Sequence, residues 1–345
     1  MRVGCSEGAL KIILHRFLDI AFFMESKSVS NTKATSTSYR DSLKSLDTEE
    51  HIDLWFYRPI GYAWAKLAAK LGVTPNAITI ASIFLGIGAG VAFYFNELWI
   101  NVIGMLLLVW ANSFDSADGQ LARMTGQYSR LGRILDGMAG DFWFITIYVA
   151  ICLREMQTSA FFGQYGWAIW TLAVVTGICH AKQASMADYY RQFHLFFLKG
   201  KDGSELENLA DLKRKFNETP WKGHFWNKLT MVTYINYTKQ QEATTPAMQK
   251  LRRLLREQFS AEAIPRDFCN DFRMKSLPLM KYTNILSFNW RVIVLFISLF
   301  VKMPWIYFVF EVTILNGLLL YMVLRHESIC RSMIQRLNEG CYNGN

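Results

Sequence analysis

The sequence has few cysteines and histidines, and no regular spacing relates them. Its 345 residues include six cysteines and six histidines, with no Cys-x-x-Cys pair. This scarcity argues against a disulfide framework and against a zinc site. No basic motif interleaved with aromatic residues is present either, so the formal net charge of +9 does not indicate a nucleic-acid partner. A membrane protein that faces anionic lipid carries the same basic excess.

Long apolar runs are the main feature of the composition. Hydrophobic residues make up 52% of the chain and are gathered into runs of about 20 residues, the length that crosses a bilayer. We therefore predict an all-α membrane protein, a six-transmembrane-helix bundle. The spans are expected at residues 77–95, 98–117, 134–153, 166–189, 284–301 and 305–324. Arginines in the 124–133 connection and at Arg325 place both termini and that connection on the cytoplasmic face.

The segments outside the spans differ in composition. The first 50 residues are rich in Ser, Thr and charge, which is typical of a disordered tail, and the working protein could start at Met1 or Met24. The following segment mixes aromatic residues with lysines, as in a helix that lies in the membrane interface. The predicted organisation is a cytoplasmic tail at 1–50, an interfacial amphipathic helix at 51–72, transmembrane helices 1–4 at 73–198, a cytoplasmic helical insert at 199–282, transmembrane helices 5–6 at 283–325 and a cytoplasmic tail at 326–345.

Four aspartates lie in one apolar neighbourhood. Asp115 and Asp118 stand three apart and share a helix face, and a return of the chain through 126–132 can bring Asp136 opposite them. An ionised carboxylate at membrane depth is costly unless a cation offsets its charge. Hard divalent cations such as Mg²⁺, or Mn²⁺, prefer oxygen ligands, and this segment offers no His or Cys. The predicted metal ligands are Asp115, Asp118, Asp136 and Asp141.

The residues between these aspartates suit a phosphate-containing ligand. Gly119 and Ala122 leave room for a ligand against the backbone, and Arg123 adds a planar cation. The segment resembles the signature of the CDP-alcohol phosphotransferase (CDP-alcohol phosphatidyltransferase) family, D-x2-D-G-x2-A-R-x8-G-x3-D-x3-D, at seven of its eight fixed positions. The family's Pro-Asn-x-Ile-Thr pattern is present at 75–79. The resemblance implies that the nucleotide is held by Gly119, Ala122, Arg123, Gly132 and Asn76.

The eighth position departs from the signature. The family has Asp where this chain has Gly140, and Asp141 follows one residue later. One step turns a side chain by about 100° around a regular helix. The family assigns this last Asp to metal binding and to the general base, so we expect Asp136 and Asp141 to be catalytic if a one-residue π-bulge restores the register. Without the bulge, the protein would bind its ligand without transferring a group.

The resemblance implies a membrane phosphotransferase of phospholipid biosynthesis. It would move a substituted phosphate from a CDP-alcohol to an acceptor hydroxyl with Mg²⁺ or Mn²⁺, release CMP, contact membrane lipids and form a homodimer. The six-span count favours CDP-diacylglycerol as the donor, with inositol phosphate or glycerol phosphate as the acceptor. CDP-ethanolamine or CDP-choline acting on diacylglycerol or ceramide is the enzymatic alternative. A non-catalytic protein that binds nucleotide-lipid or metal is the alternative of another class.

Charged residues elsewhere in the spans are candidates for acceptor binding, because ionisable groups at membrane depth are expensive. A phosphorylated acceptor could be received by Lys182, Arg191 and Arg291. Arg191 and Arg291 could equally extend to lipid phosphates. Glu311 is expected to pair with Lys302 near the far surface.

Overall fold

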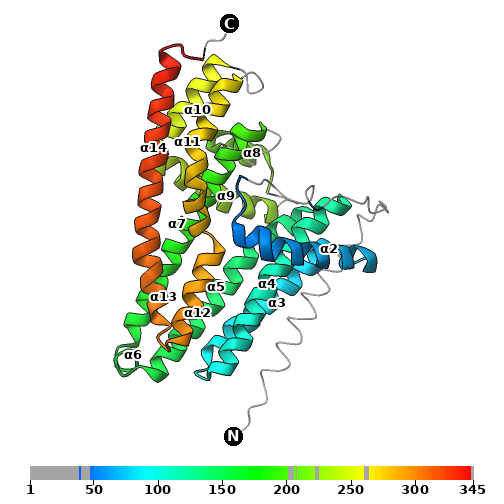
Figure 1. Ribbon diagram of the computed structural model, residues 1–345, viewed down its shortest axis with the longest axis vertical. Helices are drawn as coiled ribbons and strands as arrows, with labels where there is room; N and C mark the ends of the chain where they lie inside the picture. Colours follow the sequence, from blue (N-terminus) through cyan, green and yellow to red (C-terminus); the bar gives the residue numbers. More distant parts are fainter. Residues whose placement is uncertain are drawn as a thin grey trace.

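The computed structural model describes residues 39, 47–200, 206, 208–221, 225–259 and 264–342. The described residues form helices joined by short turns, with no strand among them (Figure 1). Most of the predicted 1–50 tail, including both possible start residues, lies outside the described residues. The helices are η2 (Asp53–Tyr57), α2 (Arg58–Leu71), α3 (Pro75–Tyr94), α4 (Leu98–Thr125), α5 (Arg130–Thr158), α6 (Ala160–Gln164), α7 (Gly166–Lys199), α8 (Leu209–Glu218), α9 (Phe225–Thr244), α10 (Pro246–Gln258), α11 (Arg266–Ile285), α12 (Phe288–Phe300), α13 (Trp305–Phe310), η4 (Glu311–Leu315) and α14 (Asn316–Asn338).

Five helical stretches of the described chain are long and apolar enough to cross a membrane. They are Pro75–Tyr94, Leu98–Thr125, Leu135–Thr158, Arg266–Phe300 and Trp305–Asn338. The chain is thus an all-helical, multi-pass membrane protein, but the predicted count of six is not confirmed. The predicted span at 166–189 lies on α7, which is long enough. Its second half carries His180, Lys182 and Gln183, and these polar residues make it less apolar than the other five.

Helices α3, α4 and α5 form the closely packed first half of the molecule. Two of the glycines in the first span, Gly86 and Gly90, lie directly under α5. A Cβ added at Gly86 would come 2.0 Å from the ring of Trp143, and one at Gly90 would come 2.7 Å from Thr146. Both glycines therefore allow the close helix approach that small residues provide in membranes.

Helix α2 lies across the direction of α3 and α4 (Figure 1). Its small residues Gly61, Ala65 and Ala68 are buried, and α2 packs against α4. Apolar side chains on its other side, such as Leu67 and Leu71, are exposed. Gly72 ends the helix at φ 70°, a left-handed conformation that glycine adopts without strain. This arrangement suits the predicted interfacial helix at 51–72, although its depth in a membrane stays a prediction.

The second half contains helices α7–α14, and its α7, α10, α11 and α14 pack around an apolar core with many aromatic rings. Phe193 of α7 meets Phe272 of α11 edge to face, and Phe197 packs against the same ring at a tilt. The predicted insert therefore packs on the ends of long helices, and its last helix, α11, leads into α12 after a short break. The last helix continues to Asn338 because apolar side chains such as Met333 and Leu337 stay buried, so residues 326–338 extend it and form no separate tail.

Candidate functional site

Three of the four predicted metal ligands converge. Asp115 and Asp118 lie on α4 and Asp136 lies on α5, and each offers a carboxylate oxygen within 4.8 Å of the others. The turn between the helices makes this possible. Gly126 ends α4 at φ 69°, and the side chain of Ser129 caps α5 by accepting the backbone N–H of Gly132 at 2.8 Å.

A threonine of α3 holds the most buried of these carboxylates. Asp118 is 4% exposed, and the hydroxyl of Thr79 donates a hydrogen bond to it. Thr79 belongs to the 75–79 pattern that begins the first span, so sequence reasoning located it but assigned it no role in the site. Through the Thr79 hydroxyl, the start of α3 contacts the acidic cluster.

The cluster lines a cavity of about 310 Å³ whose walls come from distant parts of the chain. The first wall is formed by α4 and by Asp136 of α5. The second wall is formed by side chains from residues 48–58, from 188–195 on α7 and from 287–289. Nothing in the signature indicates these second-wall residues, which lie up to 239 positions from their partners.

The predicted nucleotide-binding residues divide into two groups. Gly119 and Arg123 line the cavity, and a Cβ at Gly119 would stand 3.4 Å from the Arg123 guanidinium, so glycine leaves this space open. Ala122, Gly132 and Asn76 are not among the lining residues. A Cβ at Gly132 would come 2.3 Å from the Asn76 side chain, and Ser129 donates a hydrogen bond to that side chain at 3.0 Å. Gly132 and Asn76 therefore join the starts of α3 and α5.

Asp141 does not join the cluster. Helix α5 is a regular α-helix from Arg130 to Thr158, so the π-bulge that would return Asp141 to the register of position 140 is absent. Its exposed side chain neither lines the cavity nor belongs to the group of three converging carboxylates. The position predicted to supply the base is therefore empty of a carboxylate, because Gly140 stands there.

Of the three cations predicted to bind an acceptor, only Arg191 reaches the cavity. It donates hydrogen bonds to Ser287 at 2.9 Å and to Asn284 at 3.3 Å. Lys182 instead donates to the Gln240 carbonyl at 3.0 Å and to the Thr244 hydroxyl.

Arg291 has a buried structural partner. Its guanidinium lies 2.8 Å from the carboxylate of Glu311 and is only 1% exposed. The expected Glu311–Lys302 pair is wrong, because Glu311 is fully buried whereas Lys302 is exposed in the turn between α12 and α13. A buried charge is costly unless it is paired, and Arg291 supplies the counter-charge for Glu311.

Glu50 and Asp53, of which only Asp53 lines the cavity, share one amide. The side chain of Asn289 donates to Glu50 at 2.8 Å and to Asp53 at 2.9 Å. Burial raises the pKa of both carboxyl groups above their ordinary values, because the charged form loses hydration. The Asn289 hydrogen bonds oppose this shift.

The acidic cluster fits a hard divalent cation. Three carboxylates that approach one another within 4.8 Å repel unless a cation lies between them, and their oxygens are the ligands that Mg²⁺ and Mn²⁺ prefer. The cavity beside them leaves space for a phosphate group to complete the coordination.

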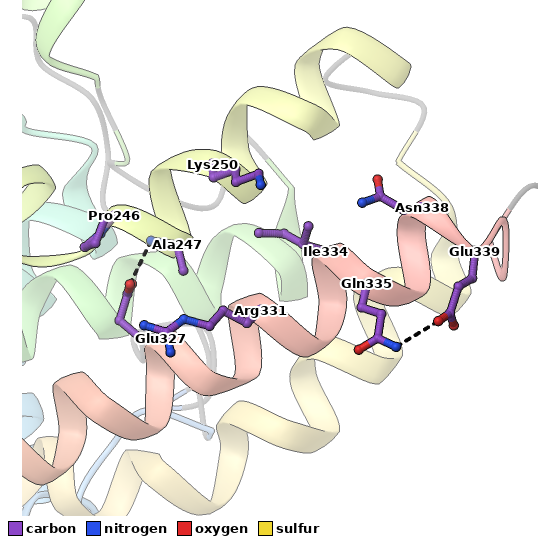
Figure 2. A pocket seen from close by; sticks show the side chains of 9 residues that line it. All are labelled: Pro246, Ala247, Lys250, Glu327, Arg331, Ile334, Gln335, Asn338 and Glu339. Carbon is purple, nitrogen blue, oxygen red and sulfur yellow. Dashed lines mark hydrogen bonds between the residues drawn. The ribbon is translucent and has the colours of Figure 1, made fainter.

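A second, more open hollow of about 710 Å³ lies between α10 and α14 (Figure 2). Glu327 points from α14 to the start of α10, where its carboxylate accepts the N–H groups of Ala247 at 2.7 Å and Met248 at 3.2 Å. This carboxylate caps a helix that has no side-chain cap of its own. We therefore interpret the acid in this hollow as structural.

Comparisons with known proteins match the part of the chain that contains the acidic cluster. The family model for CDP-alcohol phosphatidyltransferase matches residues 72–190. The chain is also similar to archaetidylinositol phosphate synthase of Pyrococcus horikoshii, with 35% identity over 71 residues, which cover 21% of this chain and 36% of that protein. The match thus spans about a third of the relative's length. The residues matched by the family model contain helices α3–α6 and most of α7.

Proposed function

We propose that the protein transfers a substituted phosphate from a CDP-alcohol to an acceptor hydroxyl and releases CMP. The observation that carries this proposal is the convergence of Asp115, Asp118 and Asp136 at a cavity that Arg123 also lines. The matched family domain contains all four residues.

The residues divide the work between binding and orientation. Asp115, Asp118 and Asp136 would hold Mg²⁺ or Mn²⁺, which when bound offsets negative charge on a diphosphate. Arg123 would contact a phosphate oxygen with its planar guanidinium, and Gly119 leaves the backbone accessible beside it. Thr79 keeps Asp118 oriented.

For the substrates we propose CDP-diacylglycerol as the donor and a phosphorylated polar alcohol, inositol phosphate or glycerol phosphate, as the acceptor. The name of the archaeal relative supports an inositol phosphate acceptor. Arg191, together with Arg58, offers cationic groups on the second wall for its phosphate. CDP-ethanolamine or CDP-choline with diacylglycerol or ceramide is the alternative that the same assay tests.

We also propose that the site faces the cytoplasm and that the protein forms a homodimer. The orientation rests on Arg130 and Arg133 at the start of α5 and on Arg325, which the positive-inside rule places in the cytoplasm. The homodimer rests on the family resemblance.

A second function has one observation in its favour. Gly140 removes the carboxylate that the family uses as a base, and a protein without a base could bind a CDP-alcohol without turning it over. The experiment below separates the two functions.

The test is CMP release by the purified protein in detergent with Mg²⁺, offered each donor with each acceptor. Asp136→Asn should lower acceptor-dependent CMP release by at least about 10³-fold, because several kcal/mol of charge stabilisation would be lost. Asp267→Asn, an exposed position at the start of α11, is the matched control and should retain activity. Binding of a CDP-alcohol without CMP release by the unmodified protein would favour the non-catalytic function.

A further inference from the structure

The transfer proposed above needs a proton acceptor that the motif does not contain. The regular helix α5 leaves Asp141 outside the cavity, and Gly140 has no side chain. Asp115, Asp118 and Asp136 would be occupied by the metal. A general base must come within hydrogen-bond reach of the acceptor hydroxyl, so it must be another group that lines the cavity.

Three further carboxylates line the cavity, all of them on the second wall: Glu49, Asp53 and Asp188. Glu49 forms an ion pair with Arg58 at 3.0 Å. Asp188 accepts hydrogen bonds at both oxygens, from Gln192 and from Tyr237, each at 3.4 Å. Both groups are engaged with neighbouring side chains.

Asp53 differs from these two. Its Oδ1 accepts the hydrogen bond from Asn289 at 2.9 Å, and within the described chain no hydrogen bond ends on Oδ2. Asp53 begins the π-helical turn η2, a distortion that is frequent at functional sites. One oxygen is thus oriented by an amide while the other is available to a ligand.

The segment that carries Asp53 is held in place at both ends. Before it, Asp47 accepts two hydrogen bonds from Arg273 of α11, at 2.7 and 3.1 Å. After it, the carbonyl of Arg58 accepts a hydrogen bond from Gln120 of α4 at 3.2 Å. These contacts with α11 and α4 fix the position of the segment, and with it the position of the Asp53 carboxylate.

We propose that Asp53 is the general base of the transfer, in place of the missing carboxylate at position 140. Its carboxylate takes the proton of the acceptor hydroxyl as that oxygen forms a bond to phosphorus. The anhydride bond to the CMP phosphate breaks, and the electron pair leaves with CMP. The proposal rests on the proposed function, and it makes Asp53, which lies outside the matched residues 72–190, part of the catalytic machinery.

The surroundings of Asp53 suit this role. Burial raises its pKa, and a higher pKa makes a carboxylate a better proton acceptor at neutral pH. The charged groups that face it are Glu49 and Glu50 on its own segment, Arg58 at the start of α2 and Arg191 on α7. The two cations favour the charged form of Asp53 and oppose this rise in its pKa.

The test measures the loss of activity in one variant and the recovery of activity when a second substitution is added. Asp53→Asn keeps an oxygen for Asn289 but accepts no proton, so kcat should fall by about 10²- to 10⁴-fold, the usual contribution of a general base. The KM for the CDP-alcohol and the affinity for Mn²⁺ should stay within about twofold, because no metal ligand is altered. The acidic limb of the pH profile of kcat/KM should disappear in this variant.

Gly140→Asp in the Asp53→Asn background should restore activity, because a Cβ at Gly140 meets nothing within 4 Å and the added carboxylate would stand one turn from Asp136. Glu50→Gln is the control, since Glu50 shares the Asn289 amide but does not line the cavity, and it should keep activity within a few-fold.

The outcomes separate this proposal from the proposed function. Unmodified protein that releases no CMP with any substrate pair would overturn the proposed function and the base together. Active unmodified protein with a fully active Asp53→Asn variant would overturn the base alone. Loss of activity without rescue by Gly140→Asp, together with a lower unfolding midpoint, would assign Asp53 a structural role instead.

Discussion

The two halves of the bundle bury acidic side chains in different ways. In the first half, Asp118 accepts a hydrogen bond from the neutral hydroxyl of Thr79, and its carboxylate stands with two others. In the second half, Glu311 meets the guanidinium of Arg291 at 2.8 Å and accepts hydrogen bonds from Tyr148 and Tyr307.

The contrast separates a binding site from a structural contact. A buried charge is costly unless it is paired. Glu311 is paired within the protein, so its charge is already balanced, whereas the cluster around Asp118 gathers like charges that a cation from outside would balance. A buried carboxylate can therefore belong to a structural contact or to a binding site. The groups that surround the carboxylate distinguish the two cases.

The largest expected effect comes from Glu311→Gln. This change leaves the Arg291 guanidinium buried without a counter-charge, and breaking a buried pair costs about 3–5 kcal/mol. We expect a large fall in the unfolding midpoint of the protein in detergent. Replacing both partners with Leu and Met should recover most of the loss, because no unpaired charge then remains.

Asp118→Asn is the matched change in the first half. It removes one of three like charges, so the unfolding midpoint should stay the same or rise in metal-free buffer, while Mn²⁺ binding is lost. Equal destabilisation by Glu311→Gln and Asp118→Asn would contradict the distinction between the two halves.

A smaller effect is expected from Thr79→Val, which tests how the cluster is oriented. The variant removes the hydroxyl that donates to Asp118 and keeps the shape of the side chain. Loss of such an outer contact lowers metal affinity by about 10- to 100-fold. A Mn²⁺ titration followed by electron paramagnetic resonance measures it. Thr125→Val on α4 removes a hydroxyl that bonds only the Leu121 carbonyl in its own helix, and should leave the affinity unchanged.

The first wall of the cavity was predictable because its information is local. The three-residue spacing of Asp115 and Asp118 and the short return to Asp136 follow from helix geometry, and the structure brings these three together. Helices α3, α4 and α5 follow from apolar length and from the breaks at Gly72 and Gly126. The metal-binding role of the cluster itself stays a prediction.

The second wall was not predictable because its contacts join distant segments. Asn289 bonds acids that lie 236 and 239 positions earlier, and no periodicity in one segment indicates the other. The Arg291–Glu311 pair was missed for the same reason. Whether Asp141 joins the cluster could not be predicted either, because the sequence alone does not tell whether α5 is regular at Gly140.

The smallest expected effect concerns the contact between α11 and the segment that carries Asp53. Asp47 accepts hydrogen bonds from Arg273 and lies 3.3 Å from the ring of His194. The Arg273 hydrogen bond lowers the pKa of Asp47, so the stabilisation is complete above the ordinary Asp value of about 3.9 and is lost as pH falls through the lower folded value. Because the Arg273 side chain is 41% exposed, the pair contributes only about 0.2–1 kcal/mol.

Asp47→Asn should therefore lower the unfolding midpoint slightly at pH 7, and the difference from the unmodified protein should shrink below pH about 3.9. Thermal unfolding in detergent at both pH values measures this. A difference that persists unchanged at the acidic pH would show that Asp47 acts through shape and not through its charge. If the contact instead serves mainly to hold Asp53 over the cavity, the variant should lower CMP release more than its small change in stability explains.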